Sequence, residues 1–163
     1  MLGCSGTHLP HQKEGIALLT TEIKPTGELL PAELLEILAA RVRVFVVEQA
    51  CAYQEVDDKD RQAVHVMLRE NGQLVAYARI VESADPNAIS FGRVLVVKAA
   101  RGRGLARQLL QATLAEISRR ASGKPIKIQA QNYLRGFYAE FGFAATSDVY
   151  LEDGIPHVDM LKQ

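Results

Sequence analysis

A turn rich in glycine and arginine carries the strongest chemical signal in the sequence. It reads Arg101-Gly-Arg-Gly-Leu-Ala106 and lies where a predicted buried strand, 89–97, meets a predicted amphipathic helix, 101–120. The first N–H groups of a helix have no intrahelical acceptor and carry partial positive charge, so such a turn favours phosphate or pyrophosphate. Gly102 and Gly104 would let the backbone approach the anion without a Cβ in the way.

The charge around this turn agrees with an anion site, because residues 98–127 contain many bases and a single acid, Glu116. Two other classes of phosphate motif fit poorly. No GxxxxGK[ST] sequence of a Walker loop is present, and Arg107 stands where the Rossmann fingerprint requires a third small residue. The turn therefore indicates an anion site of a different class.

Hydrophobic periodicity predicts the elements that position this turn. Strands are expected at 16–23, 64–69, 74–81, 89–97, 126–130, 146–151 and 158–161, and helices at 101–120, at 134–141 and from Pro31, the last with Leu34, Leu35, Leu38, Val42 and Phe45 on its apolar face. Asn71-Gly72 predicts a hairpin. This order predicts an α/β (α+β) domain over residues 16–163, after a disordered leader over 1–15.

Composition excludes several other classes of protein. With 48% hydrophobic and 23% charged residues in a chain of 163, the sequence is that of a globular protein with a sizeable core. Nineteen basic residues balance nineteen acidic ones, which argues against a dedicated nucleic-acid binder. No apolar run is long enough to span a membrane, no secretory signal is evident, and Cys4 and Cys51 form no metal motif. We therefore expect a cytoplasmic protein without a metal, a membrane partner or a nucleic-acid partner.

Several further segments share a resemblance with the turn. Arg101-Gly-Arg-Gly-Leu-Ala106 matches the (Q/R)xxGx(G/A) acyl-CoA pyrophosphate loop of the GNAT N-acetyltransferases, with alanine at a position where glycine is more usual. The remaining segments resemble the ElaA-type branch of that superfamily: Val44-Phe-Val-Val-Glu-Gln49, Cys51-Ala-Tyr-Gln-Glu-Val-Asp57, Tyr77-Ala-Arg79, Phe91-Gly-Arg-Val94, Phe137-Tyr-Ala-Glu-Phe-Gly-Phe143 and Tyr150-Leu-Glu-Asp-Gly-Ile-Pro-His157. The resemblance covers about residues 23–163 in the right order.

The resemblance implies a GNAT acyl-CoA N-acyltransferase fold, with a central mixed, mostly antiparallel sheet flanked by helices. It also implies direct transfer of an acetyl group from the cosubstrate acetyl-CoA to a primary amine in a ternary complex. The strand before the turn would splay from its neighbour and pair its exposed edge with the pantetheine arm. The implied cofactor-binding residues are Leu95, Val96, Val97, Arg101, Gly102, Arg103, Gly104, Leu105, Ala106 and Asn132.

Two residues are candidates for catalysis. Tyr138 matches the tyrosine that protonates the leaving thiolate in the superfamily, although its aromatic neighbours also suit it to core packing. Glu48 is the first choice for the general base among the acids of segment 48–60, whose other interpretation is a solvated acidic loop. His65 opens a strand, where a structural role is favoured.

The acceptor is predicted to be a small-molecule or peptide amine. Its candidate binding residues are Tyr53, Asp57, Arg79, Arg93 and His157, with the two arginines able either to pair with carboxylates or to bind an acceptor carboxylate. A non-catalytic acyl-CoA-binding sensor or interaction module is the alternative function. Pairing of strand edges near the carboxyl terminus could form a homodimer.

Overall fold

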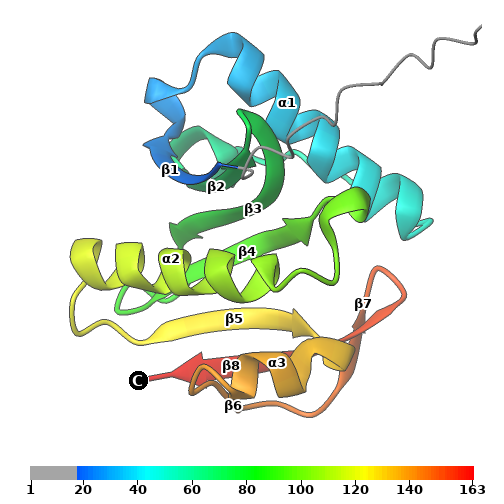
Figure 1. Cartoon of the computed structure of the whole chain (residues 1–163). Helices are drawn as coiled ribbons and strands as arrows, with labels where there is room; N and C mark the ends of the chain where they lie inside the picture. Colours follow the sequence, from blue (N-terminus) through cyan, green and yellow to red (C-terminus); the bar gives the residue numbers. More distant parts are fainter. Residues whose placement is uncertain (1–17) are drawn as a thin grey trace, which may run out of the picture.

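Eight strands form one sheet, in the order β1-β2-β3-β4-β5-β8-β6, with β7 paired to β8 (Figure 1). The computed structural model describes residues 18–163, so the predicted leader over 1–15 lies outside the described residues. The strands are β1 (Leu19–Pro25), β2 (Val64–Glu70), β3 (Gln73–Glu82), β4 (Ile89–Val96), β5 (Ile126–Gln131), β6 (Ala144–Ala145), β7 (Tyr150–Glu152) and β8 (Ile155–Lys162). All pairings are antiparallel except that of β4 with β5, which confirms a mixed, mostly antiparallel sheet.

Helices flank this sheet, as predicted. They are α1 (Pro31–Arg41), α2 (Leu105–Arg120) and α3 (Arg135–Ala139), joined by the π-helix η2 (Val42–Glu48) and by the short 3-10 turns η1 (Thr26–Glu28), η3 (Asp58–Gln62), η4 (Lys98–Ala100) and η5 (Asn132–Leu134). One hydrophobic cluster joins α2 and α3 to the sheet, and a second joins α1 and η2 to it. Successive residues of β2, such as Val66 and Met67, face opposite sides of the sheet and belong to different clusters. The sheet is therefore covered on both faces.

The β2–β3 hairpin was predicted from Asn71-Gly72, and the structure confirms it. Both residues have positive φ, 52° and 82°, which a two-residue hairpin turn of the primed type requires. The hairpin register pairs Glu70 with Gln73. Local sequence therefore determines the framework beside which the site forms.

Strands β4 and β5 run parallel but hold together at one residue pair, Ile89 with Ile126. Beyond that pair they diverge, so the splayed strand that the resemblance implied is present. The register between β3 and β4 also shifts between Tyr77 and Arg79, opposite Arg93, whose φ is 53°. Such a bulge bends a strand and redirects its side chains. The bend and the divergence open the sheet at its middle.

The predicted apolar face of the first helix is wrong in part, because Phe45 packs against the second cluster but two other members face solvent. Leu35 is 70% exposed and Val42 is exposed, whereas Ile37, Arg41 and Val44 are buried. The helix widens into a π-helix at Val42, so hydrophobic spacing no longer follows the 3.6-residue period. The buried stripe also contains Arg41, so the inner face of the helix could not be recognised from apolar residues alone.

The carboxyl-terminal elements differ in extent from the predictions. Of the strand predicted over 146–151, only residues 150 and 151 belong to a strand, β7, and the short strand β6 precedes the predicted range. Strand β8 begins three residues earlier than predicted. The turn between β7 and β8 is formed by Asp153 and Gly154, which both have positive φ. Within residues 18–163, no helix combines the length and apolar character needed to cross a membrane.

Candidate functional site

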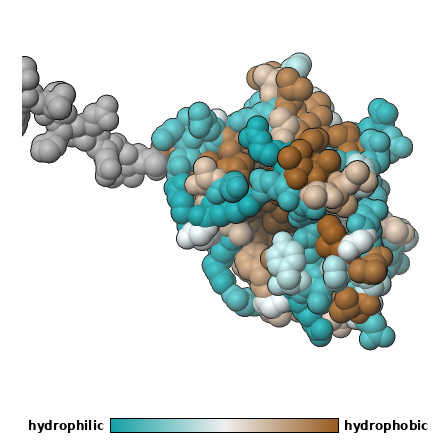
Figure 2. Space-filling model, turned by 90° about the vertical axis from the view of Figure 1, so that its right-hand side faces the viewer, coloured by the Kyte–Doolittle hydropathy of each residue, from teal (hydrophilic) through white to brown (hydrophobic). Residues whose placement is uncertain are grey.

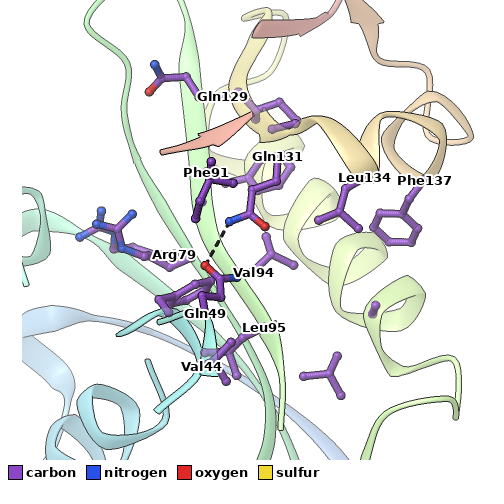
Figure 3. Close-up of a pocket in the computed structure, with 18 of the residues that line it drawn as sticks. Val44, Gln49, Arg79, Phe91, Val94, Leu95, Gln129, Gln131, Leu134 and Phe137 are labelled. Carbon is purple, nitrogen blue, oxygen red and sulfur yellow. Dashed lines mark hydrogen bonds between the residues drawn. The ribbon is translucent and has the colours of Figure 1, made fainter. Parts of the chain in front are cut away.

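A cavity of about 850 Å³ lies where β4 and β5 diverge. Besides β4 and β5, the cavity is lined by residues of η2 and the loop after it, of β3, of the start of α2, of α3 and of the β7–β8 turn. Figure 3 shows side chains of several of these elements pointing into one space. Residues that are distant in the sequence therefore line the same cavity.

The glycine- and arginine-rich turn over residues 101–106, called the α2 turn below, forms one end of this cavity. Gly102 and Gly104 both have φ of 76°, and a Cβ built on either would meet no atom within 4 Å. The N–H groups of Arg107 and Gln108 donate to the Gly104 carbonyl, so the helix begins immediately after this glycine. The amides at the start of α2 have no intrahelical acceptor and border open space, as an anion site requires.

Arginines of the turn are held by acids from other elements. Arg101 Nη2 lies 2.6 Å from Glu48 Oε2, and its Nε donates to the Val96 carbonyl over 3.0 Å. Arg103 pairs with Glu70 at the end of β2. These contacts fix the turn against β4 and η2.

The structure brings most of the predicted cofactor residues to the cavity wall. Those that line it are Leu95, Val96, Arg101, Gly102, Gly104, Leu105 and Ala106. Val97, Arg103 and Asn132 are absent from the lining. Val97 lines a separate, smaller cavity of about 290 Å³ and donates its N–H to the Val75 carbonyl of β3. Asn132 begins the 3-10 turn after β5.

Tyr138 enters the same cavity from α3. The residue is 5% exposed, and it packs against Phe91, Phe137 and Phe143 at ring-centroid separations of 5.4–6.1 Å. No residue in the described range 18–163 forms a hydrogen bond with its hydroxyl. Burial, followed by proximity to Tyr133, raises the pKa of the Tyr138 hydroxyl far above its ordinary value. At neutral pH this hydroxyl keeps its proton.

A hydrogen bond between two glutamines crosses the cavity. Gln131 Nε2 at the end of β5 donates to Gln49 Oε1 after η2 over 3.2 Å, as Figure 3 shows. Arg79 and Gln129 lie toward one side of this bridge in the view, and Leu134 and Phe137 toward the other. Gln49, Gln129 and Gln131 were not among the predicted site residues. The available signal was the alternation of β5, in which Gln129 and Gln131 flank the buried Ala130.

The acidic loop is anchored by a buried arginine. Arg41, whose side chain is fully buried, contacts Glu55 Oε1 over 2.9 Å and Asp60 Oδ1 over 2.6 Å. Glu55 and Asp60 are themselves buried. The interpretation of the whole segment as a solvated loop is therefore wrong, because α1 supplies a cation that draws these acids inward.

Two of the predicted acceptor residues belong to the same charge network. Arg79, 4% exposed, makes a bidentate contact with Asp57 at 2.7 and 3.0 Å and reaches Asp60 over 2.7 Å. Burial alone would raise the pKa of Asp57, but its hydrogen bonds to Arg79 outweigh burial and lower it. Arg79 lines the cavity and Asp57 does not. Asp57 thus lies behind Arg79 as its counter-ion.

Arg93 and Tyr53 complete this wall. Arg93 Nε lies 2.8 Å from Glu55 Oε1, and its guanidinium stands 5.5 Å from the centre of the Tyr53 ring. Both side chains line the cavity. Three arginines, Arg41, Arg79 and Arg93, thus meet three acids, so the network carries no net charge.

His65 forms part of the support beneath this wall. Its Nδ1 lies 2.7 Å from the Tyr77 hydroxyl and its Nε2 lies 2.9 Å from Thr26 Oγ1. Burial lowers the pKa of His65 to about 4. The histidine is fully buried and fully hydrogen-bonded, which agrees with the structural role favoured from the sequence.

The β7–β8 turn closes the opposite side of the cavity. His157 lines it, with Nδ1 2.8 Å from the Ile155 carbonyl and its ring stacked on Tyr150. Glu152 and Asp153 join the lining, and the thiol of Cys51 donates to the Asp153 carbonyl over 3.6 Å. Figure 2 shows the face on which the end of η2 and this turn lie, with hydrophobic side chains gathered around a hollow.

Comparisons with known proteins agree with this architecture. A family model described as "Acetyltransferase (GNAT) domain" matches residues 26–163. Protein ElaA of Escherichia coli strain K12 is 41% identical over 140 residues, covering 84% of this chain and 92% of its own. The crystal structures of an acyl-CoA N-acyltransferase from Pseudomonas aeruginosa and of E. coli ElaA each match with a TM-score of 0.85, at 39% and 38% identity, over 90% of this chain and all of theirs.

The fold is that of the acyl-CoA N-acyltransferases, and the chain belongs to the GNAT acetyltransferase family. Within the family it groups with the ElaA-type proteins, as its sequence segments predicted. An acyl-CoA thioester is the cosubstrate that this fold implies, and a small acceptor is implied with it. The residues fit that cosubstrate. Within residues 18–163, a glycine turn whose helical amides have no intrahelical acceptor meets an edge of β4 that pairs with no strand beyond Ile89, along one cavity.

Proposed function

We propose that the protein transfers an acetyl group from acetyl-CoA to a primary amine, directly and within a ternary complex. The observation that carries the proposal is the single cavity that joins the α2 turn to Tyr138 and to the β7–β8 turn. Direct transfer requires both reactants in one space, where positioning replaces a bimolecular encounter. Bound acetyl-CoA supplies the thioester, and the chain supplies the binding and proton-transfer groups.

Residues of the α2 turn and of β4 hold the cosubstrate in this proposal. The amides near Gly102 and Gly104 take the pyrophosphate, since their neighbourhood is open and positively polarised. The edge of β4 at Leu95 and Val96 pairs with no further strand of the described chain and takes the pantetheine arm by main-chain hydrogen bonds, beside the Val96 carbonyl that accepts from Arg101. Arg103 and Asn132, which lie outside the cavity lining, contribute at its rim.

Tyr138 supplies the proton that the departing thiolate needs. Burial keeps its hydroxyl protonated, and no residue of the described chain competes for that hydrogen. Glu48 remains the proposed base for the amine, and its ion pair with Arg101 links the base to the cosubstrate turn. Tyr53, Arg79, Arg93 and His157 shape the acceptor side, with Asp57 holding Arg79 in place.

Thermal unfolding and calorimetry with acetyl-CoA, CoA and ATP test cosubstrate binding. Acetyl-CoA at about 100 times its Kd should stabilise the protein by about 2.7 kcal/mol, while ATP should leave the unfolding temperature unchanged. Equal stabilisation by ATP would show a general phosphate site. Absence of any acetyl-CoA effect would contradict the proposal.

The Tyr138→Phe variant tests turnover. Release of CoA thiol in a screen of amines should fall by about 10²–10⁴-fold, because general acid catalysis contributes that much. Acetyl-CoA affinity should stay within about twofold, since a phenyl ring keeps the aromatic packing. Tyr150→Phe is the comparison variant, because it also removes one tyrosine hydroxyl, whose partners are Asp159 and Gln129, but Tyr150 itself is absent from the cavity lining.

The alternative function, an acyl-CoA sensor without turnover, predicts the same binding but a different kinetic result. In that case no amine would release thiol above the uncatalysed rate, and Tyr138→Phe would change nothing. The buried, unpartnered hydroxyl favours the enzyme over the sensor. The cytoplasmic location and the homodimer remain predictions from the sequence.

A further inference from the structure

Arg93 has an unusual backbone for a residue inside a strand. Its φ is 53°, in the left-handed region where a residue with a side chain is strained. Between Tyr77 and Arg79 of β3, two residues of β4 stand opposite one, so β4 contains one extra residue there. A bulge of this kind redirects a side chain and is common beside functional sites. The Arg93 side chain is thus aimed by a strained bulge and not by the regular pleat of the strand.

The protein holds the Arg93 guanidinium along one edge. Nε lies 2.8 Å from Glu55 Oε1, and Nη2 donates to the Glu55 carbonyl over 3.1 Å. Nη1 forms no hydrogen bond within residues 18–163 and is not among the atoms that the protein encloses. The side chain is 23% exposed and lines the cavity. The guanidinium is therefore fixed in place while the N–H groups of Nη1 stay open to the cavity.

The other two arginines of this network use their donors within the protein. Each guanidinium nitrogen of Arg41 has a partner on Glu55 or Asp60. Both Nη atoms of Arg79 contact carboxylates, and its side chain is buried. Arg93 differs from both, because it combines a rigid support with a donor that is available to a ligand.

A carboxylate is the group that suits this donor. Hydrogen bonds from a guanidinium to a carboxylate are shorter and about twice as strong as hydrogen bonds between neutral groups. Lys59 lines the same cavity, and its ammonium group forms no hydrogen bond or ion pair within residues 18–163. Since the arginines and acids of the network balance one another, Lys59 gives this wall a surplus positive charge.

The opposite wall carries the complementary charge. Glu152 and Asp153 of the β7–β8 turn line the cavity, and neither forms an ion pair within the described part of the chain. The two walls approach each other where the Cys51 thiol donates to the Asp153 carbonyl over 3.6 Å. Cys51 precedes Tyr53, whose ring centre lies 5.5 Å from the Arg93 guanidinium. A small molecule with a carboxylate and an ammonium group would therefore meet a cation at one end and acids at the other.

We propose that the acceptor is a free α-amino acid, whose carboxylate binds Arg93 at Nη1 and whose ammonium group faces the β7–β8 turn. This inference rests on the proposed function and names the class of its acceptor. The cosubstrate arm along Leu95 and Val96 ends beside Arg93, which lies two residues earlier in β4. The amine next to the bound carboxylate is therefore placed at the thioester.

The transfer balances in atoms and charge. The thioester C–S bond breaks, and an amide C–N bond forms on the acceptor. The ammonium group loses two protons, of which one goes to Glu48 and the other replaces the proton that Tyr138 gives to the thiolate. The products are the N-acetyl amino acid, CoA and the proton on Glu48.

Matched acceptors test the inference with the native protein and acetyl-CoA. Each common amino acid is compared with its carboxamide and its decarboxylated amine, and release of CoA thiol gives kcat/KM. For at least one amino acid the value should exceed those of the other two by about 10–100-fold, the effect of a hydrogen bond to a charged group. The carboxamide is a strict comparison. Its amine is less protonated at neutral pH, so it would react faster if the carboxylate were not recognised.

The Arg93→Lys variant tests the residue. Lysine keeps the positive charge but cannot contact Glu55 along one edge and the acceptor along another. The kcat/KM for the amino acid should fall by about 10–100-fold, while that for its decarboxylated amine should stay within about threefold. Arg61→Lys is the matched control, because Arg61 pairs with the exposed Asp58 and is absent from the cavity lining.

A second variant keeps the test decisive if Arg93→Lys does not fold, which thermal unfolding would show. Lys59→Gln removes an exposed charge whose side chain has no partner in the described residues. It should lower kcat/KM for the amino acid by about threefold and leave the decarboxylated amine unchanged, because an exposed charge has a modest effect.

The outcomes separate this inference from the proposed function. Equal kcat/KM values for amino acids and their decarboxylated amines would overturn the amino-acid inference alone. So would an unchanged preference in Arg93→Lys, an equal loss for all acceptors in that variant, or, where it does not fold, an unchanged preference in Lys59→Gln. Native protein that binds no acetyl-CoA, or that releases thiol with no amine, would overturn the proposed function and the inference with it.

Discussion

The two halves of the cavity are built in different ways. The half around the α2 turn comes from one continuous stretch, β4 to the start of α2, and its main feature is unpaired main-chain N–H groups. The half around Arg79 draws on α1, the acidic loop, β3 and β4, and buried ion pairs hold it together. A main-chain site is robust to side-chain changes, whereas an assembled charge network depends on every member.

The largest expected effect is a loss of folding stability when the charge network of the Arg79 half loses Arg41. Arg41→Ala leaves Glu55 and Asp60 buried without their cation, which should lower the free energy of unfolding by about 3–5 kcal/mol. Urea unfolding measures this loss. Arg61→Ala is the control, because it removes an exposed pair with Asp58 and should cost well under about 1 kcal/mol. Equal effects of the two variants would contradict the assembled-network description.

The second prediction concerns pH. Burial lowers the pKa of His65 to about 4 from its ordinary 6.5, so the unfolded chain binds a proton that the folded chain refuses. The contribution of His65 to the free energy of unfolding is therefore fully present above pH 6.5. It is lost as the pH falls from 6.5 to 4, by up to about 3 kcal/mol. Unfolding curves across that window should lose this slope in His65→Gln. They should keep it in His157→Gln, which changes a partly exposed histidine outside the network.

The third prediction sharpens the description of the α2 turn. Gly104→Ala places a methyl group in the open space beside the helix start and should raise the Kd for CoA by about tenfold, since left-handed backbone and anion contact both suffer. Gly123→Ala imposes the same backbone cost after α2, where φ is 81°, and no cavity is lined. Calorimetry with CoA should distinguish the two. Equal loss of affinity would show that only folding had changed.

The smallest effect concerns the bridge between Gln131 at the end of β5 and Gln49 at the start of the acidic loop. Gln131→Ala removes the hydrogen bond to Gln49 and should cost about 0.5–1.5 kcal/mol of stability. In a double-mutant cycle, Gln49→Ala should add little to it, because either change already breaks the bridge. Gln129→Ala, whose amide bonds Tyr150 instead, should be additive with Gln49→Ala. Additivity in both pairs would show that the bridge does not couple β5 to the acidic loop.

The same contrast explains what the sequence could predict. Gly102 and Gly104 lie in a short motif between a strand and a helix, so local pattern was enough to locate that half. The hairpin at Asn71-Gly72 was predictable for the same reason. Arg41 gave no such signal, because an arginine on a helix is ordinarily exposed and its partners Glu55 and Asp60 lie beyond the end of η2.

The π-helix is the second reason that prediction failed. Its wider turn begins at Val42, so Val42 fitted an apolar stripe in the sequence but faces solvent in the fold. Gln49 and Gln131 meet only because the end of η2 and the end of β5 come together across the cavity. Contacts of this kind follow from the tertiary arrangement and leave no local pattern.

The single residue pair between β4 and β5 has a consequence for how the protein exchanges its amide hydrogens. Beyond Ile89 and Ile126, the β4 amides that point away from β3 have no strand partner and remain open to deuterium. A cosubstrate arm that occupies the gap would act as a removable strand and protect them. Deuterium uptake at the amides of β4 and β5 would then measure the fraction of the protein that has acyl-CoA bound.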